Sequence, residues 1–138
     1  MKNVFILVGF ALLISCDPYD TRLTIENRTD EIIFYSISVN DSIRNSSPLV
    51  IDNEDTIWTQ SSLILPDSVA SEVILGRDGW KYFINEDCLD STLRVFLFDK
   101  NLVLETPWDT IYAKQKYLKK YEMSVEDLEK ANWRLVYE

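Results

Sequence analysis

Residues 92–98, with the sequence TLRVFLF, decide the fold class of this chain. Residues 95–98 are apolar without interruption, which is typical of a central β-strand covered on both faces. Such a strand needs neighbouring strands and a packed layer on either side of the sheet. The sequence therefore predicts a mainly β domain built around this segment.

Further strands are predicted upstream from short runs bounded by turn residues. Residues 23–26 (LTIE) alternate with period two, and residues 32–39 (IIFYSISV) follow the turn cluster NRTD. We expect these two runs to form a hairpin. Three short apolar bursts, at residues 49–51, 56–59 and 63–65, are the next candidates, and residues 69–75 are a further strand candidate.

Three more strands are expected downstream of the central one. Residues 102–104 (LVL) are predicted to return beside it as a hairpin partner. Residues 116–122 are rich in lysine, as edge strands often are when they must not pair with other chains. Residues 133–137 alternate between apolar and polar side chains and are expected to form the last strand of the chain. Upstream of the central strand, residues 79–84 (GWKYFI) fit a helical turn or a strand equally well.

Two short helices are predicted in the C-terminal half from their capping residues. Thr106 is expected as an N-cap, with Pro107 at the first helical position and Asp109 closing a capping box. Ser124 begins a second segment of the same pattern. Helices this short are marginal alone, so both must dock on the sheet. The expected fold is mainly β (α+β), a small sandwich-like domain with two short capped helices.

The composition excludes several function classes. The 138 residues contain no histidine, so a histidine-based catalytic triad and a histidine-ligated metal site are ruled out. Three glycines cannot build a glycine-rich phosphate loop. A net charge of −9 argues against binding to nucleic acid, which needs a positive field. We expect no metal and no cofactor.

The N-terminus has the pattern of an export signal. Lys2 precedes an apolar run at residues 4–14, which is shorter than the roughly 20 residues that a membrane-spanning helix requires. The run ends in Leu13-Ile14-Ser15-Cys16, which resembles the lipobox of bacterial lipoproteins. That resemblance implies cleavage before Cys16 and acylation, with palmitate or a similar chain, of its thiol and new amine. The alternative is an ordinary signal peptide with a cysteine at its end.

These features divide the chain into residues 1–15 as lipoprotein signal peptide, 16–21 as lipid-anchored tether and 22–138 as one β-rich domain. Loss of residues 1–15 removes Lys2 alone among charged residues and takes the net charge from −9 to −10. Cys88 is then the one remaining free thiol. Its neighbours Glu86 and Asp87 raise a thiol pKa, so we expect a buried, unreactive side chain.

The C-terminal half carries a further resemblance. The strings FLFD at 96–99, PWD at 107–109, YLKKY at 117–121, SVEDL at 124–128 and NW at 132–133 follow one another. Together they resemble a family of small uncharacterised lipoproteins of Bacteroidetes bacteria. The pattern departs at Lys120, where arginine is usual, and at Glu138, where proline often stands. The resemblance implies an exported, membrane-anchored domain and carries over no catalytic residue.

The resemblance also bears on localisation and partners. It places the protein in the bacterial cell envelope, anchored in a membrane through its N-terminal lipid. Asp17, directly after the cysteine, would indicate inner-membrane retention in enterobacteria, but that rule does not transfer safely to other bacteria. We expect the outer membrane rather than the inner one. The expected partner is another envelope protein or a glycan, and not nucleic acid.

Five Asp-Ser or Asp-Thr steps resemble the O-glycosylation motif of exported Bacteroidetes proteins. Ser42, Thr56 and Ser68 are the candidate acceptors. The alternative is that these pairs are turn and cap residues before strands. The five triplets are Asp41-Ser42-Ile43, Asp55-Thr56-Ile57, Asp67-Ser68-Val69, Asp90-Ser91-Thr92 and Asp109-Thr110-Ile111.

The sequence contains few candidate ligand-binding residues. Trp58 and Trp80 lie outside the capped helices and are the candidates for stacking against a sugar ring, although most tryptophans of a small domain are needed in its core. The leading interpretation is a lipid-anchored envelope lipoprotein that acts as a non-enzymatic binding or structural module. The alternative is a small carboxylate-dependent hydrolase acting on glycans. Such an enzyme needs two carboxyl groups about 5–10 Å apart, and an adjacent pair such as Glu86 and Asp87 does not fix that distance.

Overall fold

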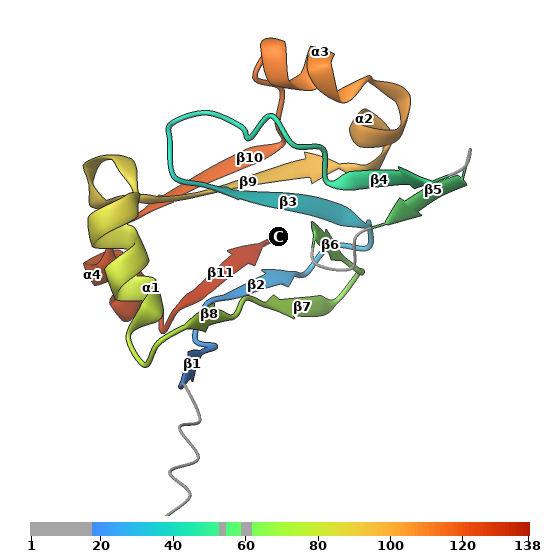
Figure 1. Cartoon of the computed structure of the whole chain (residues 1–138). Helices are drawn as coiled ribbons and strands as arrows, with labels where there is room; N and C mark the ends of the chain where they lie inside the picture. The colour runs from blue at the N-terminus through green and yellow to red at the C-terminus, as the bar shows by residue number, and fades with distance from the viewer. Residues whose placement is uncertain (1–17, 53–54, 59–61) are drawn as a thin grey trace, which may run out of the picture.

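A computed structural model describes residues 18–52, 55–58 and 62–138 of the chain. One antiparallel sheet and one mixed sheet face each other across a core (Figure 1). Short helices cover one end of the two sheets and the outer face of the antiparallel sheet. The predicted fold class, a small mainly β α+β domain, is confirmed. The predicted signal peptide and Cys16 lie outside the described residues.

The first sheet is fully antiparallel and contains the central strand. In hydrogen-bonded order it consists of β10 (Lys119–Met123), β9 (Leu93–Asp99), β3 (Ile33–Ser38) and β6 (Leu63–Ile64). All six positions from 93 to 98 in β9 are buried. The prediction of a strand covered on both faces is therefore confirmed, and so is the prediction of a lysine-rich edge strand, because β10 is an end of this sheet.

The second sheet joins the two ends of the domain. It consists of β11 (Arg134–Tyr137), β2 (Thr24–Asn27) and β7 (Ser68–Ser71), with β11 parallel to β2 and β7 antiparallel to it. β2 and β3 thus lie in different sheets, and the predicted hairpin between residues 23–26 and 32–39 is wrong.

Asn27 explains why that hairpin does not form. Its buried side-chain amide donates to the carbonyl of Glu31 at 2.6 Å, and its oxygen accepts from the backbone N–H of Thr29 at 3.1 Å. The same amide donates to Leu65 at 3.2 Å, in the segment that leaves β6. Asn27 therefore holds a turn that carries the chain from one sheet to the other.

Two further strand pairs lie beside the main sheets. β4 (Leu49–Asp52) pairs with β5 (Asp55–Trp58), and β1 (Tyr19–Asp20) pairs with β8 (Ile74–Leu75). The second pair corrects the predicted boundary of the tether. Residues 19–20 belong to the domain, because Tyr19 aligns with Leu75 and the side chain of Asp20 is buried.

Helices occupy two places around the sheets (Figure 1). α1 (Gly79–Tyr82) and α4 (Val125–Lys130) lie at one end of the two sheets, whereas α2 (Lys100–Glu105) and α3 (Trp108–Ala113) lie on the outer side of the first sheet. α1 continues into the π-helical turn η2 (Phe83–Asp87) and the 3₁₀ turn η3 (Leu89–Ser91). Residues 79–84 are thus helical, which is one of the two conformations that their sequence allows.

The capping predictions had different outcomes. Ser124 caps α4 in a full capping box with Asp127, as expected. Residues 102–104 lie in α2 and not in a strand, because Asp99 accepts the backbone N–H of Leu102 at 3.0 Å and starts a helix. Thr106 is the C-cap of that helix, so it cannot start the next one, and Pro107 is the N-cap of α3.

Buried side chains form two clusters, one on each face of the first sheet. Val95 and Leu97 face the second sheet and pack with Leu23, whereas Phe96 and Phe98 pack on the other face. The outer cluster is completed by Phe34, Ile43, Val103 and Ile111. This division follows from the two-residue period of a strand and explains why residues 95–98 of β9 are apolar at every position.

Gly79 allows α1 to approach the strand pair β1–β8. A methyl group added at Gly79 would lie 2.7 Å from the Cγ2 atom of Ile74, closer than two such carbon atoms can approach.

Among the described residues, no helix has the length and apolar character that crossing a bilayer requires.

Candidate functional site

A hollow of about 630 Å³ opens between the edge strands of the two sheets. We call it the edge groove. Its lining comes from β6, from β7, from the segment that joins them and from the two residues after β7, together with Tyr35 of β3. The lining residues are Tyr35, Leu63, Ile64, Leu65, Ser68, Val69, Ala70, Ser71, Glu72 and Val73. Its position at two sheet edges makes the backbone, as well as the side chains, available to a partner.

Tyr35 and Glu72 form the polar centre of the groove. The hydroxyl of Tyr35 donates a hydrogen bond to Oε1 of Glu72. Tyr35 is 5 % exposed, and burial, followed by the hydrogen bond to Glu72, raises the pKa of its hydroxyl. The two residues also line a second hollow of about 220 Å³, next to Arg44. The pair therefore stands where two hollows meet.

The edge of β7 presents unpaired backbone groups. The N–H of Glu72 donates to the carbonyl of Leu23 at 2.9 Å, and Ala70 stands opposite Ile25 in the same register. Hydrogen bonding alternates along an antiparallel pair. Val69 and Ser71 therefore direct their N–H and C=O groups away from β2, toward the open edge.

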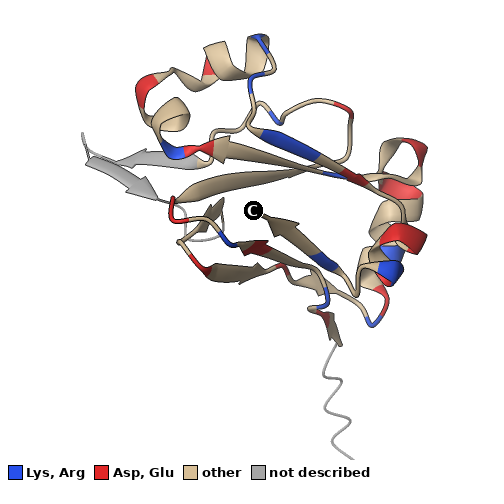
Figure 2. Cartoon of the chain, turned by 180° about the vertical axis from the view of Figure 1, so that it is seen from behind, with Lys and Arg blue, Asp and Glu red and all other residues tan. Residues whose placement is uncertain are grey.

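β7 also lacks the charges that usually protect an edge. Its sequence is Ser-Val-Ala-Ser, whereas β10, an edge of the other sheet, carries Lys119 and Lys120. Figure 2 shows the contrast, with β7 free of blue and red and β10 marked in blue. Lysine on an edge strand opposes pairing with another chain. The β7 edge has no such barrier.

The titratable groups around the groove are few. Among the residues that the structure describes, the linings of these two hollows include one carboxylate, Glu72, and one guanidinium, Arg44. Hydrolysis of a glycoside by the common mechanism needs two carboxyl groups on either side of the bond. What the lining offers instead is hydroxyls, apolar side chains and free backbone groups, which suit binding.

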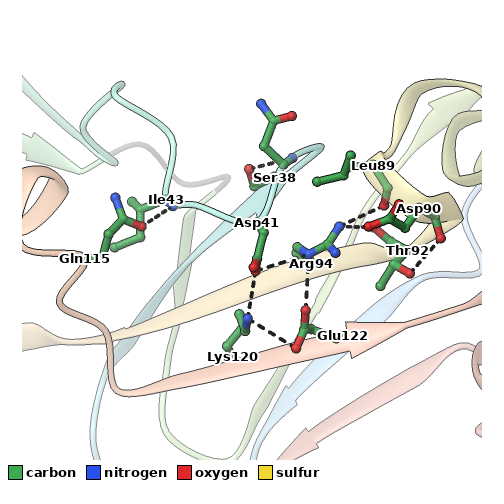
Figure 3. Close-up of polar contacts among 11 residues, drawn as sticks. Ser38, Asp41, Ile43, Leu89, Asp90, Thr92, Arg94, Gln115, Lys120 and Glu122 are labelled. Atoms are coloured by element: carbon green, nitrogen blue, oxygen red, sulfur yellow. Dashed lines mark hydrogen bonds and ion pairs between the residues drawn. The ribbon is translucent and has the colours of Figure 1, made fainter.

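A second polar cluster surrounds Arg94 on the first sheet (Figure 3). Arg94 is only 5 % exposed, and its Nη1 donates to the carbonyls of Leu89 at 2.9 Å and Thr92 at 3.2 Å. Its Nε lies 3.2 Å from Glu122 and 3.4 Å from Asp41. Lys120 completes the cluster, 2.8 Å from Asp41 and 3.2 Å from Glu122.

The charges of this cluster satisfy one another. Lys120, and then Arg94, lower the pKa of the Asp41 carboxyl, and Asp41 in turn raises the pKa of Lys120. Each cation faces two carboxylates and each carboxylate faces two cations. The cluster therefore fastens the loop after β3 to β9 and β10, and it has little charge left to recruit a ligand.

Cys88 has the environment that its neighbours predicted. Its side chain is buried, at 7 % exposure, and burial followed by the charge of Asp87 raises the pKa of the thiol. A thiol that is both buried and hard to ionise is a poor nucleophile. Among the described residues, no group of three or more acidic or cysteine side chains is placed to hold a metal ion.

Of the two tryptophans singled out for stacking, the structure describes the side chain of Trp80 and not that of Trp58. Trp80 is 4 % exposed and packs in the core, edge to face against Phe83, so it offers no open ring face to a sugar. The stacking prediction is wrong for Trp80, because the side chain of this α1 residue is buried in the core. Trp58 lies in β5, and its side chain is outside the described residues.

The candidate acceptors for glycosylation lie in loops and edge strands. Ser42 is partly exposed in the loop after β3, between Asp41 of the Arg94 cluster and the fully buried Ile43. Ser68 begins β7 and donates to the carbonyl of Pro66 at 3.0 Å. Thr56 lies in β5, with its side chain outside the described residues.

Sequence reasoning did not find Tyr35, Glu72 or the β7 edge as a site. The available signal was the absence of charge in residues 68–71, in contrast with the lysines of residues 116–122. This difference in charge indicates an open edge only when both segments are known to be edge strands of their sheets. Comparisons with protein-family models, with curated proteins and with solved structures find no match for this chain.

Proposed function

We propose that the mature protein is a lipid-anchored lipoprotein of the bacterial cell envelope that binds an extended polypeptide segment of another envelope protein along β7. The lipid anchor is supported by the apolar run at residues 4–14 and by Leu13-Ile14-Ser15-Cys16. Two or three acyl chains anchor a protein stably where one does not. The outer membrane is the proposed location, in keeping with the resemblance to Bacteroidetes lipoproteins.

The observation that carries the binding role is the uncharged edge of β7. An extended segment laid along it would pair with the outward N–H and C=O groups of Val69 and Ser71. Alternate side chains of the segment would enter the edge groove, where Leu63 and Ala70 supply apolar contacts. Main-chain hydrogen bonds give affinity in such strand addition, and the side-chain pockets give specificity.

The glycan and the hydrolase are the competing possibilities. A glycan would use the hydroxyls and Arg44 of the smaller hollow rather than the strand edge. A carboxylate-dependent hydrolase would need a second acid opposite Glu72, and the described linings of the two hollows hold no other carboxylate. The strand edge favours a polypeptide over both.

Capture from detergent-solubilised envelope fractions tests the binding role. The bait is the full acylated protein, compared with Ser71→Pro and Ser71→Ala. Because the Ser71 N–H faces the open edge, proline removes an edge donor without breaking a bond to β2. We expect Ser71→Pro to lose a specific partner that Ser71→Ala keeps. Capture that is equal in both variants would refute binding along the edge.

The chemical nature of the partner is tested in the same experiment. Protease treatment of the fraction should abolish capture, and periodate oxidation should leave it intact. The opposite pattern would identify a glycan and overturn the polypeptide proposal. The anchor is tested separately by intact mass and fractionation: Cys16→Ala should lose the acyl mass and the membrane association, and unchanged fractionation would refute the anchor.

Glycosylation at Ser42, Thr56 or Ser68 stays a proposal of its own. The intact mass of the native lipoprotein decides it. Mass beyond the chain and its acyl groups, lost in the matching Ser→Ala or Thr→Val variant, supports modification. A mass fully explained by chain and lipid contradicts it.

A further inference from the structure

A row of apolar side chains projects from the strand pair β1–β8 and from Val73, the residue directly before β8. Exposure alternates without a break from residue 69 to residue 75, so the odd-numbered positions face outward. Val73 is 55 % exposed and Leu75 is 60 % exposed. Tyr19, at 65 %, stands directly opposite Leu75 on the neighbouring strand. We call Tyr19, Val73 and Leu75 the apolar strip.

The strip is held rigidly, because the residues that alternate with it are tied into the domain. Asp20 is 2 % exposed and accepts hydrogen bonds from Nε of Arg22 at 2.8 Å and from the backbone N–H of Trp80 at 3.1 Å. Ile74 pairs with Asp20, and its side chain packs so closely on Gly79 that an added methyl group there would lie 2.7 Å from the Cγ2 atom of Ile74. With these side chains fixed inward, Tyr19 and Leu75 must face outward.

The strip lies next to the predicted point of lipid attachment. This step rests on the proposed acylation of Cys16. Tyr19 follows Cys16 by three residues, so their Cα atoms lie within about 11 Å of each other even if the chain is fully extended. β1 also projects from the second sheet on the side opposite to the first sheet, α2 and α3 (Figure 1). A lipid on Cys16 therefore brings this pole of the domain to the bilayer surface.

We infer that the apolar strip is a membrane-contacting surface, which the lipid anchor presses into the interfacial layer of the bilayer. Tyrosine is enriched at that layer, because its ring is apolar and its hydroxyl remains hydrated. Val73 and Leu75 then contact the boundary of the acyl chains, as the apolar face of an interfacial segment does. The domain is thereby oriented, with α2 and α3 turned away from the membrane and the β7 edge beside it.

The short connection selects the membrane over another occupant. A soluble partner or a second copy would have to insert between the strip and a bilayer that the chain holds within about 11 Å of Tyr19. An anchored domain with a long linker would carry no such constraint. Two residues, Asp17 and Pro18, separate Cys16 from the start of β1 at Tyr19.

Depth-dependent quenching in vesicles tests the inference. The acylated full-length protein, in a Cys88→Ala background, is labelled with a fluorophore at Leu75→Cys or at Leu104→Cys. Leu104 is the matched control, since it is apolar, 44 % exposed and located on α2 at the opposite pole. The vesicles contain phosphatidylethanolamine, phosphatidylglycerol and a lipid with a nitroxide near the head group.

We expect strong loss of fluorescence at position 75 and little at position 104. Equal quenching at the two positions, in a protein whose mass shows the acyl chains, would overturn the membrane-contact surface while leaving the anchor intact. A mass without acyl chains would instead refute the proposed lipoprotein. Energy transfer between labels at position 75 that persists on dilution into excess vesicles would show a second copy on the strip and also overturn the inference.

A second pair of variants guards against effects of the label. Leu75→Asp and Leu104→Asp both place a charge at an exposed position, so neither should disturb the core. Accessibility of a label at Tyr19→Cys to a water-soluble quencher should rise in Leu75→Asp and remain unchanged in Leu104→Asp. No rise in the Leu75→Asp protein would contradict contact between the strip and the bilayer.

Discussion

The hydroxyl of Tyr35 on β3 donates to the carboxylate of Glu72, directly after β7, and so links the two sheets on the side where the edge groove opens. The donor is buried, while the acceptor is partly exposed to solvent. The pair therefore has two effects. It stabilises the sandwich at its open side, and it holds a negative charge at the centre of the proposed binding surface.

Removal of this hydroxyl should lower stability modestly. Tyr35→Phe keeps the ring in the core and deletes one hydrogen bond to a charged acceptor, which we expect to lower the free energy of unfolding by about 1–2 kcal/mol. Urea denaturation measures the change. Tyr112→Phe is the control, since Tyr112 lies at the surface of α3, and it should change stability by less than about 0.5 kcal/mol. Equal losses would show that the Tyr35 link is not the cause.

The same pair predicts loss of stability at high pH. Burial and the hydrogen bond to Glu72 raise the pKa of Tyr35 in the folded state above its ordinary value of about 10. Above that pH the unfolded chain releases this proton and the folded chain retains it, so stability falls as the pH rises. Tyr35→Phe should show a shallower decline between pH 10 and 11 than the wild type, measured by denaturation at each pH. Parallel curves would contradict this assignment.

Asp20 should make the protein sensitive to acid. Hydrogen bonds from Arg22 lower the pKa of this carboxyl in the folded state, and the backbone N–H of Trp80 adds to the effect. Its contribution is therefore present at neutral pH and is lost as the pH falls below about 4 toward the folded-state pKa. Asp20→Asn should be less stable than the wild type at pH 7, and the difference should shrink at pH 3. A difference that does not depend on pH would point to packing alone.

Arg94 should matter far more than the lysine beside it. Arg94→Met removes a buried guanidinium that makes two hydrogen bonds to backbone carbonyls as well as both ion pairs, and we expect a loss of about 2–3 kcal/mol. Lys120→Met breaks two ion pairs with partly exposed carboxylates and should lower stability by less than about 1 kcal/mol. Thermal unfolding of both variants checks the order. The reverse order would show that the ion pairs outweigh the carbonyl contacts.

The sequence predicts elements well where the local pattern has one physical solution. Unbroken apolar character made residues 95–98 a central strand, and Ser124 with Asp127 made a helix start. Pairing was less predictable, because Asn27 uses contacts with Glu31 and Leu65 that local spacing does not reveal. The edge groove could not be predicted from the sequence for the same reason. Tyr35 and Glu72 are 37 positions apart, and they meet because the sheet that contains β3 packs against the sheet that contains β7.

The two expected caps provide a direct test of this difference between pattern and structure. Ser124 accepts the backbone N–H of Asp127 at 3.2 Å, so Ser124→Ala should lower the free energy of unfolding by about 1 kcal/mol. Thr106 has an equally good sequence context but is the C-cap of α2, and no cap hydrogen bond from a side chain is present at the start of α3. Thr106→Ala should therefore stay within about 0.5 kcal/mol of the wild type. Chemical denaturation of the two variants measures both values, and a loss at Thr106 equal to that at Ser124 would show that α3 is capped in solution as its sequence suggests.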